Sequence, residues 1–245
     1  MANIRINDSV LSRAERVVLD TLVRHIPSAL TPDHLTSVGL VGAVITAGGF
    51  FACWWSNWFL AAVVLGLFLN WLGDSLDGTL ARYRRIERPH YGYFIDHSTD
   101  LIAQTLIVVG LGFSPYFTIP SALLVLSLYL LMSSYTYLRV VTESVHRLSY
   151  GGMGATEFRI LVAAWSLAAA WIGPEVSTRH IYSFIALDVV IGFLSGCTFC
   201  GFIWVVRNDL SRLRKEERTA QKGVAARDEK KLEPLKTDFA KQVIQ

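Results

Sequence analysis

The sequence predicts an all-α integral membrane protein: a bundle of six transmembrane helices with an N-terminal interfacial helix. Three observations carry this prediction. The chain has 245 residues, of which 52% are hydrophobic. Apolar runs near the length that spans a bilayer, about 20 residues, recur along it. Finally, Lys and Arg are concentrated in alternate connections between these runs, as in proteins that cross a membrane several times.

Residues 1–30 form the first predicted segment. Between residues 10 and 28, apolar and basic side chains alternate at helical spacing, with Arg13, Arg16 and Arg24 among them. This pattern is typical of a helix that lies in the cytoplasmic membrane interface. It fits equally well a short helix packed on the ends of the spans.

The transmembrane domain is expected over residues 31–206. Thr31 and Pro32 suit the cap and the first turn of its first helix. The six predicted spans are 35–54, 57–80, 92–113, 119–142, 157–173 and 180–206. Residues 207–245 are dense in charge and predict a cytoplasmic tail, either a solvated helix or a disordered extension.

The basic residues also predict the orientation in the membrane. The connector 83–91, after the second span, and the segment after the sixth span are rich in Arg and Lys, whereas the connections near 55 and 116 carry no charge. Positively charged connections stay in the cytoplasm. Both termini and the connector 83–91 are therefore expected on the cytoplasmic side.

Two acidic pairs flank this connector. Asp74 and Asp77 are three residues apart, and Asp96 and Asp100 are four apart, so each pair shares one helix face. The short connector brings the two faces together. Four carboxylates at a bilayer edge are costly unless they are compensated. Two Mg²⁺ or Mn²⁺ ions would compensate them, because hard cations prefer oxygen ligands.

Small residues and an arginine accompany the acidic pairs. Gly78 and Ala81 leave one flank of the helix open for a close ligand. Gly92 has no side chain that would project from the facing helix into this space. Arg82 has the donor fork that suits a phosphate. We therefore expect a slot for a flat group and its phosphates, in which two ions hold a pyrophosphate. Ion pairing with the connector arginines would be enough to explain one aspartate at the end of a span. It explains less well four aspartates at two helical spacings.

His97 lies between the aspartates of the second pair. Histidine is the side chain most often used for proton transfer in catalysis, which makes His97 a candidate general base. Alternatively, it hydrogen-bonds one of its acidic neighbours and only orients that carboxylate. The residues themselves leave both roles open.

The acidic segment resembles the signature of the CDP-alcohol phosphotransferase family, D-x-x-D-G-x-x-A-R-(x)n-G-x-x-x-D-x-x-x-D. Every defined position matches, from Asp74 to Asp100. The resemblance implies a membrane enzyme, commonly a homodimer, that uses Mg²⁺ or Mn²⁺. Such an enzyme displaces CMP from a CDP-linked donor by attack of an acceptor hydroxyl.

The resemblance also implies roles for single residues. By position, Asp74, Asp77 and Asp96 are metal ligands, and Asp100 is a ligand, the general base or both. The nucleotide site is implied to comprise Gly78, Ala81, Arg82, Gly92 and Asp74.

Two functional hypotheses differ in whether the lipid is the acceptor or the CDP-linked donor. The sequence Asp96-His97-x-x-Asp100 is similar to that of choline and ethanolamine phosphotransferases, which favours a soluble CDP-alcohol donor and a lipid alcohol acceptor. The alternative is that CDP-diacylglycerol donates a phosphatidyl group to a soluble alcohol such as a polyol phosphate. A phosphorylated acceptor requires further cationic side chains. The candidates are Arg84, Arg85, Arg88, Arg139 and Arg159.

A different class of function is a non-catalytic cation transporter or a lipid-binding scaffold. Asp188, in the sixth predicted span, would fit an ion path, although a hydrogen bond within the bundle is the more common role. A transporter should carry acids near the middle of several spans, whereas here they gather at one face. No basic and aromatic pattern typical of nucleic-acid binding is present.

Overall fold

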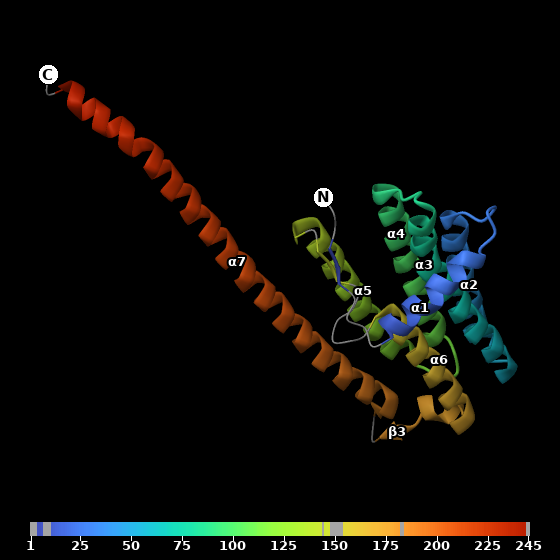
Figure 1. Ribbon diagram of the computed structural model, residues 1–245. Helices are drawn as coiled ribbons and strands as arrows, with labels where there is room; N and C mark the ends of the chain where they lie inside the picture. Colours follow the sequence, from blue (N-terminus) through green and yellow to red (C-terminus); the bar gives the residue numbers. More distant parts are fainter. Residues whose placement is uncertain (1–3, 7–10, 144, 148–153, 182–183, 244–245) are drawn as a thin grey trace. The chain divides into compact units, whose positions relative to one another are not determined.

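The computed structural model describes residues 4–6, 11–143, 145–147, 154–181 and 184–243. α-Helices dominate this part of the chain, and six of them are long and apolar enough to cross a membrane (Figure 1). The prediction of an all-α bundle with six spans is confirmed. Residues 1–3 and 7–10 of the predicted interfacial segment lie outside the described residues.

The part of the chain that the structure describes contains seven α-helices. In chain order they are α1 (Ser12–Leu22), α2 (Pro32–Ala52), α3 (Leu60–Arg84), α4 (Pro89–Gly112), α5 (Ile119–Glu143), α6 (Ala155–Ile172) and α7 (Ala186–Val243). Two very short strand pairs accompany them. They are β1 (Ile4–Ile6) with β2 (Val145–Arg147), which run parallel, and β3 (His180–Ile181) with β4 (Phe184–Ile185), which run antiparallel.

The first span begins as the sequence predicts. Thr31 Oγ1 accepts a hydrogen bond from the backbone N–H of His34 at 3.3 Å, and His34 Nδ1 accepts one from the Thr31 N–H at 3.2 Å. Pro32 is the first residue of α2, where its missing N–H costs nothing. These contacts satisfy backbone groups that the start of a helix leaves open.

The last span differs from the prediction. We expected it to start at residue 180, but β3 and β4 lie there and α7 begins at Ala186. The helix then continues without a break at residue 206, where the charged tail was expected to start, as far as Val243. The chain divides into residues 1–195, which contain the acidic segment, and residues 196–245.

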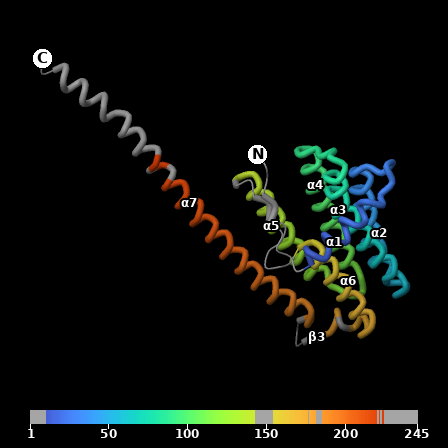
Figure 2. The backbone as a smooth tube through the Cα atoms, in the orientation of Figure 1, coloured from blue at the N-terminus to red at the C-terminus, as the bar shows by residue number. Residues whose placement is uncertain are grey.

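Glycines allow α2 and α3 to approach at backbone distance. A Cβ atom on Gly42 would lie 2.5 Å from the backbone N of Asn70 and 2.6 Å from the carbonyl O of Gly66. A Cβ on Gly73 would overlap with the backbone of Gly39. Small residues permit this approach between membrane helices. Figure 2 shows α2, α3 and α4 side by side, and α2 contacts both of the others.

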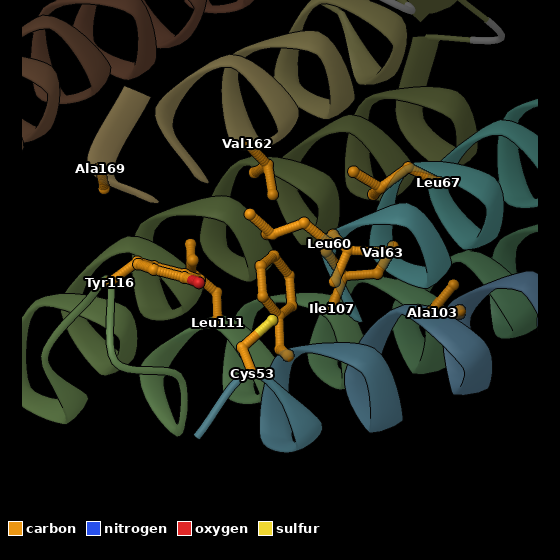
Figure 3. Close-up of a cluster of buried hydrophobic side chains, with 12 residues drawn as sticks. Cys53, Leu60, Val63, Leu67, Ala103, Ile107, Leu111, Tyr116, Val162 and Ala169 are labelled. Atoms are coloured by element: carbon orange, nitrogen blue, oxygen red, sulfur yellow. The ribbon is translucent and has the colours of Figure 1, made fainter. Parts of the chain in front are cut away.

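An apolar cluster packs the bundle around the connection between α2 and α3. Cys53, Leu60 and Val63 belong to this cluster together with Leu111 and Tyr116 (Figure 3). Burial raises the pKa of the Tyr116 phenol to about 12, so the hydroxyl remains a hydrogen-bond donor. It donates to Asn57 Oδ1 at 2.8 Å.

Replacement of Gly42 by alanine should destabilise the protein, because the new methyl group meets the backbone of α3 and not a flexible side chain. Overpacking of this kind costs about 1–3 kcal/mol. Gly48→Ala is the matched control on the same helix, since its Cβ would meet nothing within 4 Å. Thermal unfolding in detergent, followed by tryptophan fluorescence, should give a lower midpoint for Gly42→Ala alone. Equal midpoints for the two variants would contradict the backbone contact.

Candidate active site

A pocket lies where α2, α3 and α4 meet, and it contains all four aspartates of the sequence motif. Its lining residues are Thr36, Gly39, Leu40, Asn70, Asp74, Asp77, Asp96, Thr99, Asp100 and Ala103. Polar side chains thus come from each of the three helices. The contact between α2 and α3 forms one wall, and the facing turns of α4 form the other.

Three of the aspartates form a compact group. Asp74, Asp96 and Asp100 each offer one carboxylate oxygen, and these oxygens lie within 4.8 Å of one another. A Mg²⁺ ion holds its oxygen ligands at about 2.1 Å, so opposite ligands lie about 4.2 Å apart. The group could therefore hold a hard cation after a small adjustment. The pairing of faces from α3 and α4 is the one that the spacing of the acids predicts.

Asp77 lines the same pocket but is held differently. It is 6% exposed, and its Oδ2 accepts a hydrogen bond from the Thr36 hydroxyl at 2.6 Å. Its Oδ1 accepts the Gly78 backbone N–H at 2.5 Å. One oxygen is therefore tied to α2 and the other to its own helix. Thr36 is not among the predicted site residues, because no local spacing relates it to the acidic motif.

A buried arginine from α6 contacts two of the lining residues, Asp74 and Asn70, although it does not line the pocket itself. Arg159 Nη2 lies 2.7 Å from Asp74 Oδ2, and Arg159 Nε donates to Asn70 Oδ1 at 2.7 Å. Asn70 Nδ2 in turn donates to the Gly39 carbonyl at 2.9 Å. Sequence reasoning named Arg159 among five candidate arginines and overlooked Asn70. A polar amide in an apolar span was the available signal for Asn70.

The arginines of the connector have other roles. Arg84 donates to the carbonyl groups of Ile26, Pro27 and Leu30 at 3.1, 2.8 and 2.5 Å. Arg88 pairs with Asp33. Arg84 thus ties the end of α3 to the segment that leads into α2, and Arg88 ties the start of α4 to the first turn of α2.

The remaining two candidates lie elsewhere. Arg85 caps α3 in a left-handed conformation, with φ of 57°. Arg139 is buried on α5. By contrast, Arg159 contacts the acidic group directly.

The residues predicted to contact the nucleotide lie along the same two helices. A Cβ on Gly78 would come within 3.3 Å of Arg82 Nη1, so this glycine leaves room for the guanidinium group. Arg82 is exposed and donates to Thr79 Oγ1 at 3.2 Å. A Cβ on Gly92 would meet nothing within 4 Å, and Ala81 is half-buried. Open space thus lies beside Gly92, whereas the Arg82 guanidinium group occupies the space beside Gly78.

His97 packs between two tyrosines and is not among the residues that line the pocket. Its ring stacks on Tyr93 with centroids 4.0 Å apart and lies 4.7 Å from the ring of Tyr137. The Nδ1 atom is 3.4 Å from Asp96 Oδ2. The imidazole therefore lies beside Asp96 and outside the pocket, whereas Asp100 lines the pocket itself.

Asp188 does not resemble part of an ion path. It accepts hydrogen bonds from Thr118 and Ser121, the latter at 2.6 Å. Both donors lie around the start of α5. The acid therefore has the bundle-stabilising role that the sequence analysis regarded as the more common one.

The sequence profile of the CDP-alcohol phosphatidyltransferase family matches residues 25–194. The chain belongs to this family. The match covers α2 to α6 and includes every residue of the pocket. The resemblance inferred from the acidic signature is thus confirmed, and with six spans the chain is an integral membrane transferase.

Three proteins illustrate what the chain is similar to. Inner membrane protein YnjF of Escherichia coli is 43% identical over 81 residues, which cover 33% of the chain and 36% of that relative. Phosphatidylinositol phosphate synthase of Cutibacterium acnes is 26% identical over 78% of the chain and 87% of its own length. Archaetidylinositol phosphate synthase of Methanothermobacter thermautotrophicus is 28% identical over 74% and 90%.

Replacement of Thr36 by valine should weaken cation binding at the pocket. The change removes the hydroxyl that holds Asp77 and preserves the side-chain shape. Loss of such an outer hydrogen bond typically lowers metal affinity by about tenfold or more. Binding of Mn²⁺ can be measured on purified protein by electron paramagnetic resonance. Ser37→Ala is the control, since that exposed hydroxyl contacts only the Asp33 carbonyl among the described groups. Equal affinities would contradict a role for the Thr36 contact.

Proposed function

We propose that the protein transfers a phosphatidyl group from CDP-diacylglycerol to the hydroxyl of a phosphorylated polyol and releases CMP. The observation that carries the proposal is the buried Arg159 beside the acidic group. Its Nη1 has no hydrogen-bond partner among the described residues. A buried guanidinium N–H without an acceptor favours an incoming oxyanion, such as the phosphate of an acceptor.

The relatives support this choice between the two donor hypotheses. Two of them, aligned over most of their length, are named for the synthesis of phosphatidylinositol phosphate and archaetidylinositol phosphate. A lipid of that kind carries a phosphorylated polyol as its head group. Its formation by a CDP-alcohol phosphatidyltransferase requires a lipid-linked donor and a soluble acceptor. CDP-diacylglycerol as the donor therefore has more support than the soluble CDP-alcohol donor that the sequence favoured.

Mg²⁺ or Mn²⁺ is the proposed cofactor, with two ions as the working number. Asp74, Asp96 and Asp100 would hold the cations, and Asp77, which lines the same pocket, would complete the ligand set. When bound, the cations would neutralise the pyrophosphate and the charge that develops on the departing CMP. The chain's own contribution is to fix these carboxylates through Thr36 and Arg159.

The residues of the pocket have separate tasks in the proposed reaction. Asp100 faces the pocket and takes the proton from the acceptor hydroxyl. The acceptor oxygen forms a bond to the phosphorus that carries the diacylglycerol group, and the bond from this phosphorus to the CMP oxygen breaks. Arg82 holds a phosphate at the mouth of the slot, with Gly78 and Ala81 beneath it. His97 orients Asp96.

We also propose that this site opens to the cytoplasm, with both termini on that side. The basic connector beside the acidic pairs supports this orientation. Highly exposed tryptophans at the other end of α2 and α3, namely Trp54, Trp55 and Trp58, suit the opposite membrane interface. A homodimer, which the family resemblance implies, remains a prediction.

Purified protein with Mn²⁺ should release CMP from CDP-diacylglycerol when a phosphorylated polyol such as inositol phosphate is the acceptor. Unphosphorylated inositol should react poorly, because nothing then engages Arg159. Asp77→Asn should be inactive. If CMP is released only from CDP-choline with diacylglycerol, the hypothesis of a soluble CDP-alcohol donor is correct instead. If the wild type releases no CMP with any pair of donor and acceptor, the proposed enzymatic activity is refuted. In sealed vesicles, the soluble acceptor should react from the cytoplasmic face alone.

The general base can be assigned by comparing two substitutions. Asp100→Asn should lower kcat by at least about 100-fold, as expected when a base is lost. His97→Gln should retain much more activity, since His97 is outside the pocket and acts through Asp96. The assay is CMP release at saturating substrate. A larger loss for His97→Gln than for Asp100→Asn would reverse the assignment.

A further inference from the structure

A carboxylate from α1 joins the two helices that carry Asp74 and Arg159. Glu15 Oε1 accepts three hydrogen bonds. The donors are Trp71 Nε1 at 2.7 Å and Ser75 Oγ at 3.1 Å, both on α3, and Thr156 Oγ1 at 2.9 Å, on α6. One oxygen atom of α1 thus connects α3, which carries Asp74, to α6, which carries Arg159. Figure 1 shows α1 lying across this part of the bundle.

The position of α1 is fixed by further contacts. Leu19 and Val23 are buried in one apolar cluster with Leu76 and Leu80 of α3. At the other end of α1, the backbone N–H of Leu11 donates to Glu157 Oε1 on α6 at 3.0 Å. Glu15 therefore projects from a helix that is docked on both partners. It is not the end of a freely moving segment.

The donors to Glu15 are neighbours of the reactive groups in the sequence. Ser75 follows Asp74, and successive helical side chains are about 100° apart, so the two point to different sides of α3. Thr156 precedes Arg159 by about one turn of α6. The ion pair between Asp74 and Arg159, at 2.7 Å, joins the same two helices on the pocket side. Glu15 thus closes a ring of polar contacts around the interface of α3 and α6.

We propose that Glu15 is a positioning residue for the active site. By holding α3 and α6 at a fixed separation, it keeps the Asp74 carboxylate within the acidic group while that carboxylate is paired with Arg159. This role rests on the proposed function, because it assumes that the acidic group binds metal. Loss of the Glu15 carboxylate lets the two helices shift, and Arg159 then draws Asp74 away from the other two ligands.

The test is Mn²⁺ binding to purified protein without substrates, measured by electron paramagnetic resonance. Glu15→Ala should weaken binding by about tenfold or more, the usual effect of losing an outer-shell partner. Glu15→Gln retains an acceptor oxygen and should bind much closer to wild type. Asp20→Asn changes an exposed acid on the same helix and should have no effect. Tyr116→Phe deletes a hydrogen bond remote from the pocket and controls for general destabilisation.

Thermal unfolding of each variant separates positioning from stability. A lower midpoint for Glu15→Ala with unchanged Mn²⁺ affinity would overturn the proposal. If Glu15→Ala does not fold, Thr156→Val and Ser75→Ala each remove one donor and should show smaller losses of affinity in the same direction; wild-type affinity in both would refute the role. If the wild type does not bind Mn²⁺, the metal site itself is refuted. If the wild type binds Mn²⁺ and the variants bind it with the same affinity, only the role of Glu15 is refuted.

Discussion

The backbone contact between α2 and α3 is the constraint on which the rest of the site depends. Gly42 and Gly66 allow the two helices to meet without intervening side chains. At that distance the Thr36 hydroxyl reaches Asp77, and the Asn70 amide reaches the carbonyl of Gly39. A larger residue in the contact would separate these groups. The aspartate would then be buried without the donor that makes its burial tolerable.

The balance of charge in the pocket follows from contributions of several helices. Aspartates from α3 and α4 concentrate negative charge, and Arg159 from α6 offsets part of it. Neutral donors, such as Thr36, hold individual oxygens in place. The arrangement leaves a net negative group with partly fixed geometry, which is what a hard cation requires. The same partial compensation explains how these acids are tolerated at the edge of a membrane domain.

Much of the fold and the centre of the site could be predicted because they depend on local patterns. Span length, the Thr31 cap and the helical spacing from Asp74 to Asp100 are all visible in short segments of sequence. The contacts of Glu15 and Arg159 could not be derived in this way, since they join residues far apart in the chain and depend on how helices pack. The predicted start of the last span was wrong because Ile181, Phe184 and Ile185 fit short strands as well as a helix.

The ion pair between Asp74 and Arg159 also bears on the order in which the protein is made. The ribosome completes α3 and α4, with all four aspartates, before it reaches α6. During insertion, the acidic residues must therefore rely on water, ions or the connector arginines. The hydrogen bond from Thr156 to Glu15 forms only when α6 reaches α1, which the ribosome has made much earlier. Completion of the site thus coincides with completion of most of the membrane domain, and a truncated chain would carry the acids without their counter-charge.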